Sequence, residues 1–295
     1  MKTILVPIDF TEPSENALVY ANSLAARLPA RIVLVDNGSA DEPPPELRAA
    51  RLRRLEALAE RLRYQQLARQ SGRRINYWYH LATGPIPDAL EALVTGYKAD
   101  LLVTGLNLTK GTASTAAGDA VTLLPDQLSC PVLIVPPGHH ELPTYVVVAG
   151  NFAHFQGQRL AWLPCLARTT SAHFDLVQFQ PDDSMCLGSL KKALLNAHAH
   201  LPSAAVHMLP QEDALEGISG YCSQHSAELL VIASSAGELL HQFFNPNATR
   251  ANPYHLCIPV LLLPTWTRPT EANWAECSLK LAVENRMADV SMETL

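Results

Sequence analysis

The segment TGLNLTKGTASTAAGD, residues 104–119, has the residue types that come closest to a chemical site in this sequence. Its glycines Gly105, Gly111 and Gly118 are spaced as in a loop whose backbone N–H groups cradle phosphate. Lys110 could add a phosphate contact from the same loop. A stretch rich in Gly, Ser and Thr is also typical of a plain connection between two apolar runs. The segment is therefore open to both interpretations, a nucleotide loop and a flexible connection.

Two positions in this loop oppose phosphate binding. Leu108 stands where a close backbone approach favours glycine, because a side chain keeps N–H groups away from phosphates. Asp119 stands where a hydroxyl donor would be favourable, and at ~4 Å from a phosphate oxygen its repulsion is about 4 kcal/mol, roughly three orders of magnitude in affinity. A Mg²⁺ ion shared with the phosphates would reverse that sign. We expect no bound cofactor. The alternative is ATP, with or without Mg²⁺.

The surrounding sequence predicts strands that alternate with helices. Apolar runs of strand length occupy residues 4–8, 30–36, 74–82, 99–105 and 129–136, and helical periodicity occupies 11–28, 46–74 and 86–98. Continuous apolar strands indicate a parallel sheet that is covered on both faces. Ligands bind such a sheet at the carboxyl ends of its strands, where the strand order reverses. The residues that we expect there are Asp9, Val35, Gly84, Gly105, Leu108, Gly111, Gly118 and Asp119.

The sequence contains an internal repeat. ADLLV at 99–103 recurs as AELLV at 227–231, and PVLIVP at 131–136 recurs as PVLLLP at 259–264, both at an offset of 128 residues. ILVPIDF, which begins at residue 4, aligns more weakly with VVVAGNF. The Pro- and Gly-containing segment PPGHHELPT interrupts helix and strand between the copies. We predict domains at 1–138 and 139–266, followed by a tail at 267–295.

The ordered series ILVPIDF, a Gly-Pro pair at 84–85, ADLLVTG, a glycine-containing loop and CPVLIVP resembles the universal stress protein family, and the two copies resemble its tandem form. The resemblance implies an α/β fold of two tandem five-stranded parallel-sheet units. These units would be Rossmann-like, of the adenine nucleotide alpha hydrolase-like type, and packed as a pseudo-dimer. It also implies a role in stress-response regulation or binding without turnover, or alternatively an ATP-binding switch with slow hydrolysis.

The resemblance also assigns roles to single residues. In nucleotide-binding members an aspartate that closes the first strand contacts the adenosine, which places that role at Asp9. The alternative for Asp9 is the N-cap of the helix that follows. Leu108 and Asp119 depart from the family's glycine and hydroxyl. In the second copy the counterparts of Asp9, Gly105 and Gly118 are Asn151, Ala233 and Pro246, so we expect this copy to be a structural partner.

Composition and charge limit which binding partners and which cellular compartment we expect. The net charge of −6 favours neither nucleic acid nor an anionic membrane as partner. Asp9, Glu12 and Glu15 interrupt any amino-terminal signal sequence, so we expect a cytoplasmic protein. An unidentified protein, an adenosine-type ligand or a second copy of the chain stay open as partners.

Other candidate chemistry is weak. The sequence has no nucleophile elbow, zinc-protease motif or P-loop motif, so we assign no catalytic residue. The cysteines and histidines lack metal-ligand spacing, and we assign no metal site. Nine arginines and three glutamates between 46 and 74 predict a solvated helix face with local ion pairs, or else a docking surface for an acidic partner.

Overall fold

The structure is a computed structural model, and it describes residues 2–36, 44–68, 73–82, 86–105, 128–150, 152, 162–180, 187–210, 214–232 and 258–263. The first half contains β1 (Lys2–Ile8), α1 (Glu12–Arg27), β2 (Ala30–Asp36), α2 (Pro45–Ala68), β3 (Asn76–Leu81), α3 (Ile86–Tyr97), β4 (Leu101–Gly105) and β5 (Val132–Val135). The second half contains β6 (Tyr145–Ala149), α6 (Trp162–Thr170), β7 (His173–Gln180), α7 (Leu187–His200), β8 (Ala205–Pro210), α8 (Ala214–Gln224), β9 (Leu229–Ile232) and β10 (Val260–Leu262).

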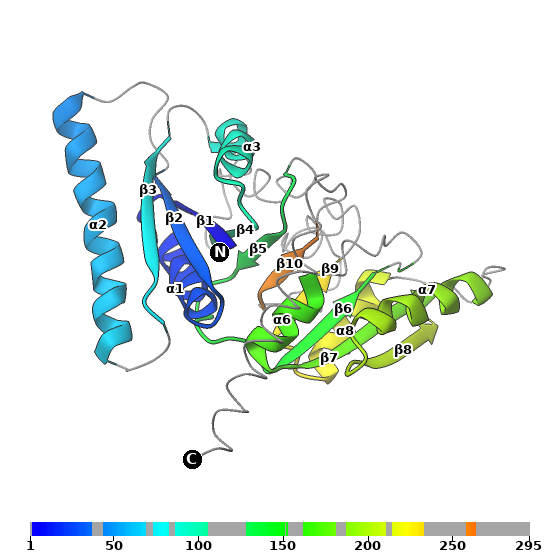
Figure 1. The fold of residues 1–295 in the computed structure, drawn as a ribbon. Helices are drawn as coiled ribbons and strands as arrows, with labels where there is room; N and C mark the ends of the chain where they lie inside the picture. The colour runs from blue at the N-terminus through cyan, green and yellow to red at the C-terminus, as the bar shows by residue number, and fades with distance from the viewer. Residues whose placement is uncertain are drawn as a thin grey trace, which may run out of the picture.

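The strands of both halves form one ten-stranded sheet with the order β3-β2-β1-β4-β5-β10-β9-β6-β7-β8 (Figure 1). Within each half all pairs are parallel, and the order of one half mirrors that of the other. The halves meet where β5 pairs antiparallel with β10. The predicted α/β fold of two related units with parallel sheets is confirmed. The joint is a continuation of the sheet, which the sequence pattern did not specify.

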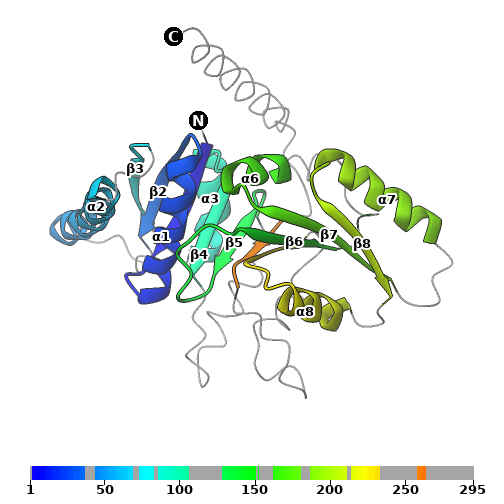
Figure 2. The same ribbon diagram turned by 90° about the horizontal axis from the view of Figure 1, so that it is seen from below.

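Helices from both halves cover both faces of the sheet. One core lies beneath α1, α2, α6 and α7, and the other lies beneath α3 and α8. Figure 2 shows this division in the second half, where α6 and α7 lie on one side of the strands and α8 on the other. Successive strand residues alternate between the cores, as Ile4 and Leu5 do. Both faces of the central strands are therefore buried, which explains their continuous apolar runs.

Helix α1 begins close to the end of β1, and its start is encoded locally. Pro13 lies in the first turn, where a missing N–H costs nothing, and Glu12 and Glu15 place negative charge at the amino end of the helix. The buried Asn16 donates from Nδ2 to the carbonyl of Pro136 at 2.9 Å, which ties the helix to the exit of β5. The amino end of α1 is thus fixed against the carboxyl ends of the strands.

The predicted domain limits at 138/139 and 266/267 stay a prediction. Residues 267–295 lie outside the described residues. Within the described part of the chain, no helix combines the length and apolar character needed to cross a membrane.

Candidate functional site

The carboxyl ends of β1, β2 and β4 form one edge of the first half, which we call the ligand edge. Ile8 of β1 pairs with Asp36 of β2, and β1 also pairs with β4. Asp9 directly follows β1, and Gly105 is the last residue of β4. The connection order reverses between β1 and β4, so the predicted position of the site at this edge is consistent with the topology.

Asp9 is exposed at this edge and is held by its own loop. Its Oδ1 accepts hydrogen bonds from the N–H of Thr11 at 2.9 Å and from Thr11 Oγ1 at 2.5 Å. Thr11, and not Asp9, is the N-cap of α1, so the N-cap interpretation of Asp9 is wrong. Partial burial raises the pKa of the Asp9 carboxyl, but hydrogen bonds from Thr11 and Ser14 outweigh burial and hold the pKa below its ordinary value. Asp9 therefore offers an ionised, accessible acceptor for a ligand hydroxyl.

Gly105 is explained by packing. A Cβ at this position would lie 2.2 Å from the carbonyl oxygen of Pro13 and 2.4 Å from its carbonyl carbon. Both atoms belong to the backbone of α1, which cannot move aside as a side chain can. The first glycine of the loop is thus required for β4 to pass the amino end of α1, whether or not a phosphate binds.

Val35 reaches the ligand edge only with its backbone. It is fully buried and belongs to the core beneath α3, where it packs with residues such as Leu90. Its neighbour Asp36 is also buried, and Asp36 Oδ2 lies 2.6 Å from Arg51 Nε of α2. The prediction that Val35 lines the site therefore does not extend to its side chain.

Two arginines of α2 lie at the ligand edge, which the sequence interpretation missed. Arg51 forms the ion pair with Asp36, and the guanidinium of Arg54 lies over the ring of Phe10 at 3.8 Å from its centroid. Phe10 directly follows Asp9 and adopts a left-handed backbone, φ 60°. The spacing of three residues between Arg51 and Arg54 was the available signal, because it places both on neighbouring parts of one helix face.

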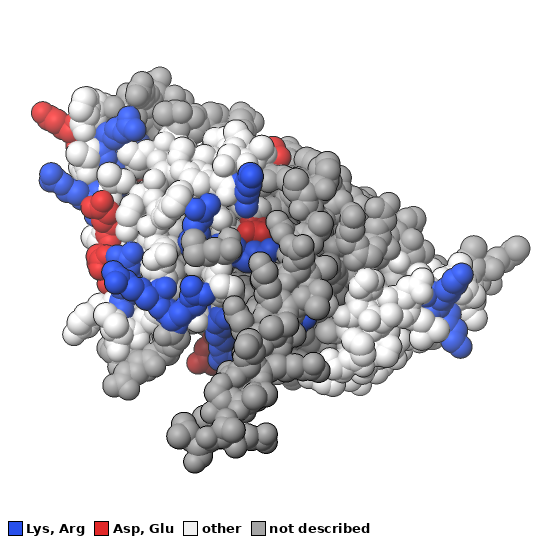
Figure 3. All heavy atoms as spheres, in the orientation of Figure 1, with Lys and Arg blue, Asp and Glu red and all other residues white. Residues whose placement is uncertain are grey.

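Arg61 and Arg63 of α2 also pair with acidic groups of the chain. Arg61 pairs with Glu15 of α1 at 2.6 Å, and Arg63 pairs with Glu60. Figure 3 shows Lys and Arg gathered over the first half with acidic residues between them. These contacts favour the prediction of a solvated face with local ion pairs over that of a docking surface.

The corresponding edge of the second half is built differently. Phe152, the counterpart of Phe10, is buried, and its N–H donates to Gln178 Oε1 at 3.0 Å. Gln178 continues the register of β7 to the position that Asp36 holds in β2. In the second half, the Gln178 side-chain amide, which accepts a backbone hydrogen bond, thus stands where Asp36 pairs with Arg51 in the first half.

The remaining predicted positions lie outside the described residues: Gly84, Leu108, Lys110, Gly111, Gly118, Asp119, Asn151, Ala233 and Pro246. The structure therefore brings together Asp9, Val35 and Gly105 of the predicted set. Among the described residues, no three His, Cys, Asp or Glu side chains form a group that could hold a metal ion.

Comparison with known proteins supports the resemblance. Residues 1–136 match the model of the universal stress protein family. No curated protein matches the chain in sequence.

Solved structures match nearly the whole chain. A universal stress protein from Archaeoglobus fulgidus DSM 4304 is 12% identical with a TM-score of 0.64, over 90% of this chain and 98% of that one. A functionally unknown protein from Pseudomonas aeruginosa PAO1 is 16% identical with a TM-score of 0.57, over 95% and 98% of the two chains. A putative universal stress protein from Pseudomonas aeruginosa UCBPP-PA14 is 15% identical with a TM-score of 0.56, over 90% and 93%. At these identities the likeness establishes the fold.

Proposed function

We propose that the chain, whose residues 1–136 match the model of the universal stress protein family, is a tandem universal stress protein that acts by binding, without turnover. Its role is regulation in the stress response through a ligand or a protein partner. The second half is a degenerate copy that supports the first. The mirrored strand order of the two halves supports the tandem interpretation.

The contact between Gly105 and Pro13 is the observation that carries the proposal. A glycine in a phosphate loop normally argues for a phosphate, because its missing side chain admits one. Here the space beside Gly105 is occupied by the backbone of α1. The glycine is therefore retained for packing, and Leu108 and Asp119 oppose phosphate in the rest of the loop. This combination favours a fold that has kept its scaffold and lost the conventional nucleotide.

The alternative is an ATP-binding switch with slow hydrolysis, and Asp9 is the observation in its favour. Its carboxylate is exposed, ionised and positioned by Thr11 at the ligand edge. An adenosine hydroxyl could donate to it. Mg²⁺ would then have to offset the charge of Asp119.

Titration calorimetry with ATP, with and without Mg²⁺, separates the two functions. We expect no binding heat from the unmodified protein at about 1 mM ATP. The double variant Leu108→Gly with Asp119→Ser should bind ATP, with an affinity gain of about 1000-fold from the removed repulsion alone.

A third variant shows where the gained nucleotide binds. Adding Asp9→Asn to the double variant should weaken the new binding, because the amide keeps an acceptor but loses the charge. Micromolar binding by the unmodified protein would contradict the degenerate interpretation and would favour the ATP-dependent switch. If the triple variant binds ATP as tightly as the double variant, the nucleotide binds at a site that does not include Asp9.

A further inference from the structure

The second half contains a buried carboxylate where the first half has a core valine. Asp100 N–H bonds the carbonyl of Thr3, and Glu228 N–H bonds that of Tyr145, so Thr3 and Tyr145 are equivalent. Two residues further, Leu5 pairs with Val33 of β2, and Val147 pairs with Asp175 of β7. The Asp175 side chain is only 2% exposed.

Buried charge is unfavourable without partners, and Asp175 has an unusual set of them. Its Oδ2 accepts hydrogen bonds from the hydroxyls of Tyr145 and Tyr221, the latter at 2.6 Å. Oδ2 lies 3.7 Å from His207 Nε2, and Oδ1 lies 3.2 Å from His173 Nε2. Oδ1 makes no hydrogen bond of its own among the described residues. One carboxylate oxygen is therefore satisfied by phenols, and the other faces an imidazole.

The two imidazoles are accessible to solvent although the carboxylate is not. The side chains of His173 and His207 are 54% and 36% exposed. They belong to β7 and to β8, the strand at the outer edge of the sheet. Protons can therefore reach the cluster from outside while water does not reach Asp175.

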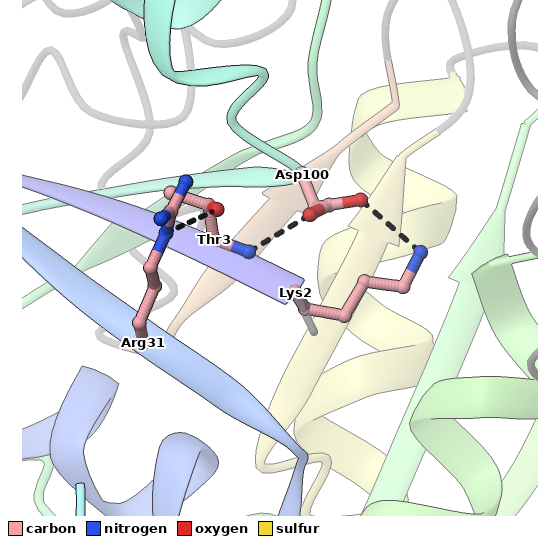
Figure 4. Close-up of polar contacts among 4 residues, drawn as sticks. All are labelled: Lys2, Thr3, Arg31 and Asp100. Carbon is pink, nitrogen blue, oxygen red and sulfur yellow. Dashed lines mark hydrogen bonds and ion pairs between the residues drawn. The ribbon is translucent and has the colours of Figure 1, made fainter. Parts of the chain in front are cut away.

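Among the described residues, the same region of the first half has no such cluster, although His80, the register counterpart of His207, lies 3.0 Å from the Tyr97 hydroxyl. Thr3 Oγ1 accepts a hydrogen bond from Arg31 Nε, and Asp100 accepts one from the Thr3 N–H and pairs with Lys2 (Figure 4). These charges lie around the amino end of β1. Val33 of β2 belongs to the apolar core beneath α3. The cluster is thus specific to the second half, and neither the proposed nucleotide loop nor its loss accounts for it.

We propose that His173, His207 and Asp175 form a proton-responsive lock, which holds β8 and α8 to the sheet more firmly when the imidazoles are protonated. Histidine is the side chain whose ordinary titration falls between about pH 5 and 8. A protonated imidazole next to Asp175 forms an ion pair with the carboxylate, whereas a neutral imidazole contributes at most an N–H hydrogen bond without the attraction of opposite charges. The lock does not depend on the function proposed above.

The two phenols that face Asp175 do not change charge in this range. They are Tyr145 on β6 and Tyr221 on α8, with His225 stacked on Tyr221 at 4.2 Å between ring centroids. Burial, with the hydrogen bond and charge of Asp175, raises the pKa of Tyr145 to about 12 and also raises the pKa of Tyr221. Burial raises the pKa of the neighbouring Cys222 thiol to about 12. The imidazoles of His173 and His207 are therefore the groups whose charge would act directly on the Asp175 carboxylate.

The charge state of Asp175 decides whether mild acid strengthens or weakens the lock. Burial raises the pKa of its carboxyl, but the two tyrosine hydroxyls and the charges of His207 and His173 outweigh burial and lower the pKa overall. The carboxylate is thus ionised throughout the range in which histidine gains its proton. Its own contribution to stability is present above about pH 4 and is lost as the pH falls through its lowered pKa. The lock should be tightest in mild acid and weaker above about pH 7.

Hydrogen exchange measured by mass spectrometry at about pH 5.5 and about pH 8, corrected for the intrinsic rate, tests the lock. In the unmodified chain, protection of β8 and α8 should be about tenfold higher at the lower pH, with β1 of the first half as internal reference. The double variant His173→Gln with His207→Gln should lose this response. The control variant, His198→Gln with His200→Gln on α7, should keep it.

A second variant tests whether the response depends on the charge of Asp175 and not on the size of the replaced imidazoles. Asp175→Asn keeps the size of the group and removes its charge, so it should also abolish the pH response of β8 and α8. An unchanged response in both variants, or protection that falls in mild acid in the unmodified chain, would overturn the proposal.

Discussion

The two halves share one strand order, yet among the described residues they bury their carboxylates, Asp36 and Asp175, near opposite ends of the strands. In the first half the carboxyl edge carries Asp9, Asp36 and Arg51, and the core beneath α3 is apolar. In the second half the carboxyl edge is closed by an amide bonded to the backbone, and a carboxylate is buried beneath α8 near the amino edge. The same core position therefore holds Val33 in one half and Asp175 in the other. The difference teaches that the partners of a buried site, and not the fold, decide which residue it tolerates.

Transfer of the acid into the first half should have the largest effect. Val33→Asp places a carboxyl among apolar side chains, without the tyrosines that Asp175 has. Such burial raises a carboxyl pKa by about three units or more, so we expect a loss of about 4 kcal/mol at pH 7. Because the raised pKa favours the neutral acid, the loss should shrink as the pH falls towards about 4, opposite to the acid sensitivity of Asp175. Urea unfolding at several pH values measures both, and a loss independent of pH would contradict the comparison.

A change at the ligand edge should have the next largest effect. Gly105→Ala would bring a Cβ to 2.2 Å from the Pro13 carbonyl oxygen, and we expect a loss of about 3 kcal/mol from the forced backbone shift. Gly96→Ala is the matched control, because nothing lies within 4 Å of its Cβ. Gly96 lies in the last turn of α3, so that control should stabilise by at most about 0.5–1 kcal/mol. Equal stabilities of the two variants in urea would show that β4 is not tightly packed on α1.

The smallest effect should come from making the second half resemble the first. Asp175→Val leaves the buried Tyr145 and Tyr221 hydroxyls without their acceptor, at a cost of about 2 kcal/mol. Adding Tyr145→Phe and Tyr221→Phe removes those hydroxyls, so the triple variant should regain most of that loss. Thermal unfolding of the single and triple variants at one pH measures the recovery. A triple variant less stable than the single one would mean that the phenols have another role.

The element pattern was predictable because it depends on local rules. Pro13 at the start of α1, the continuous apolar run of β1 and the periodic leucines of α2 each specify their element within a few residues. The position of Asp9 at the carboxyl edge also followed, because parallel strands end at a common edge. The alternative role of Asp9 as an N-cap is wrong, because α1 begins at Glu12 and its N-cap is Thr11, two residues after Asp9.

Contacts between distant elements were not predictable. Gly105 has the same identity in a phosphate loop and in a packing contact, and only the approach of the Pro13 backbone distinguishes them. The sequence predicts Arg51 and Arg54 as part of a solvated face, because it does not show that they meet Asp36 and Phe10 at the ends of β2 and β1. The second-half cluster draws its side chains from β6, β7, β8 and α8, far apart in sequence.

By itself the sequence determined the repeat, the alternation of strands and helices, and the departure of Leu108 and Asp119 from a phosphate loop. These features follow from residue type, periodicity and charge, which are local quantities. Only the tertiary structure decided that the halves join through β5 and β10, that Gly105 serves packing, and that a valine position became a carboxylate with its own donors. The physical reason is that desolvation and close contact depend on which residues, distant in sequence, pack against one another. The order of residue types along the chain does not specify those contacts.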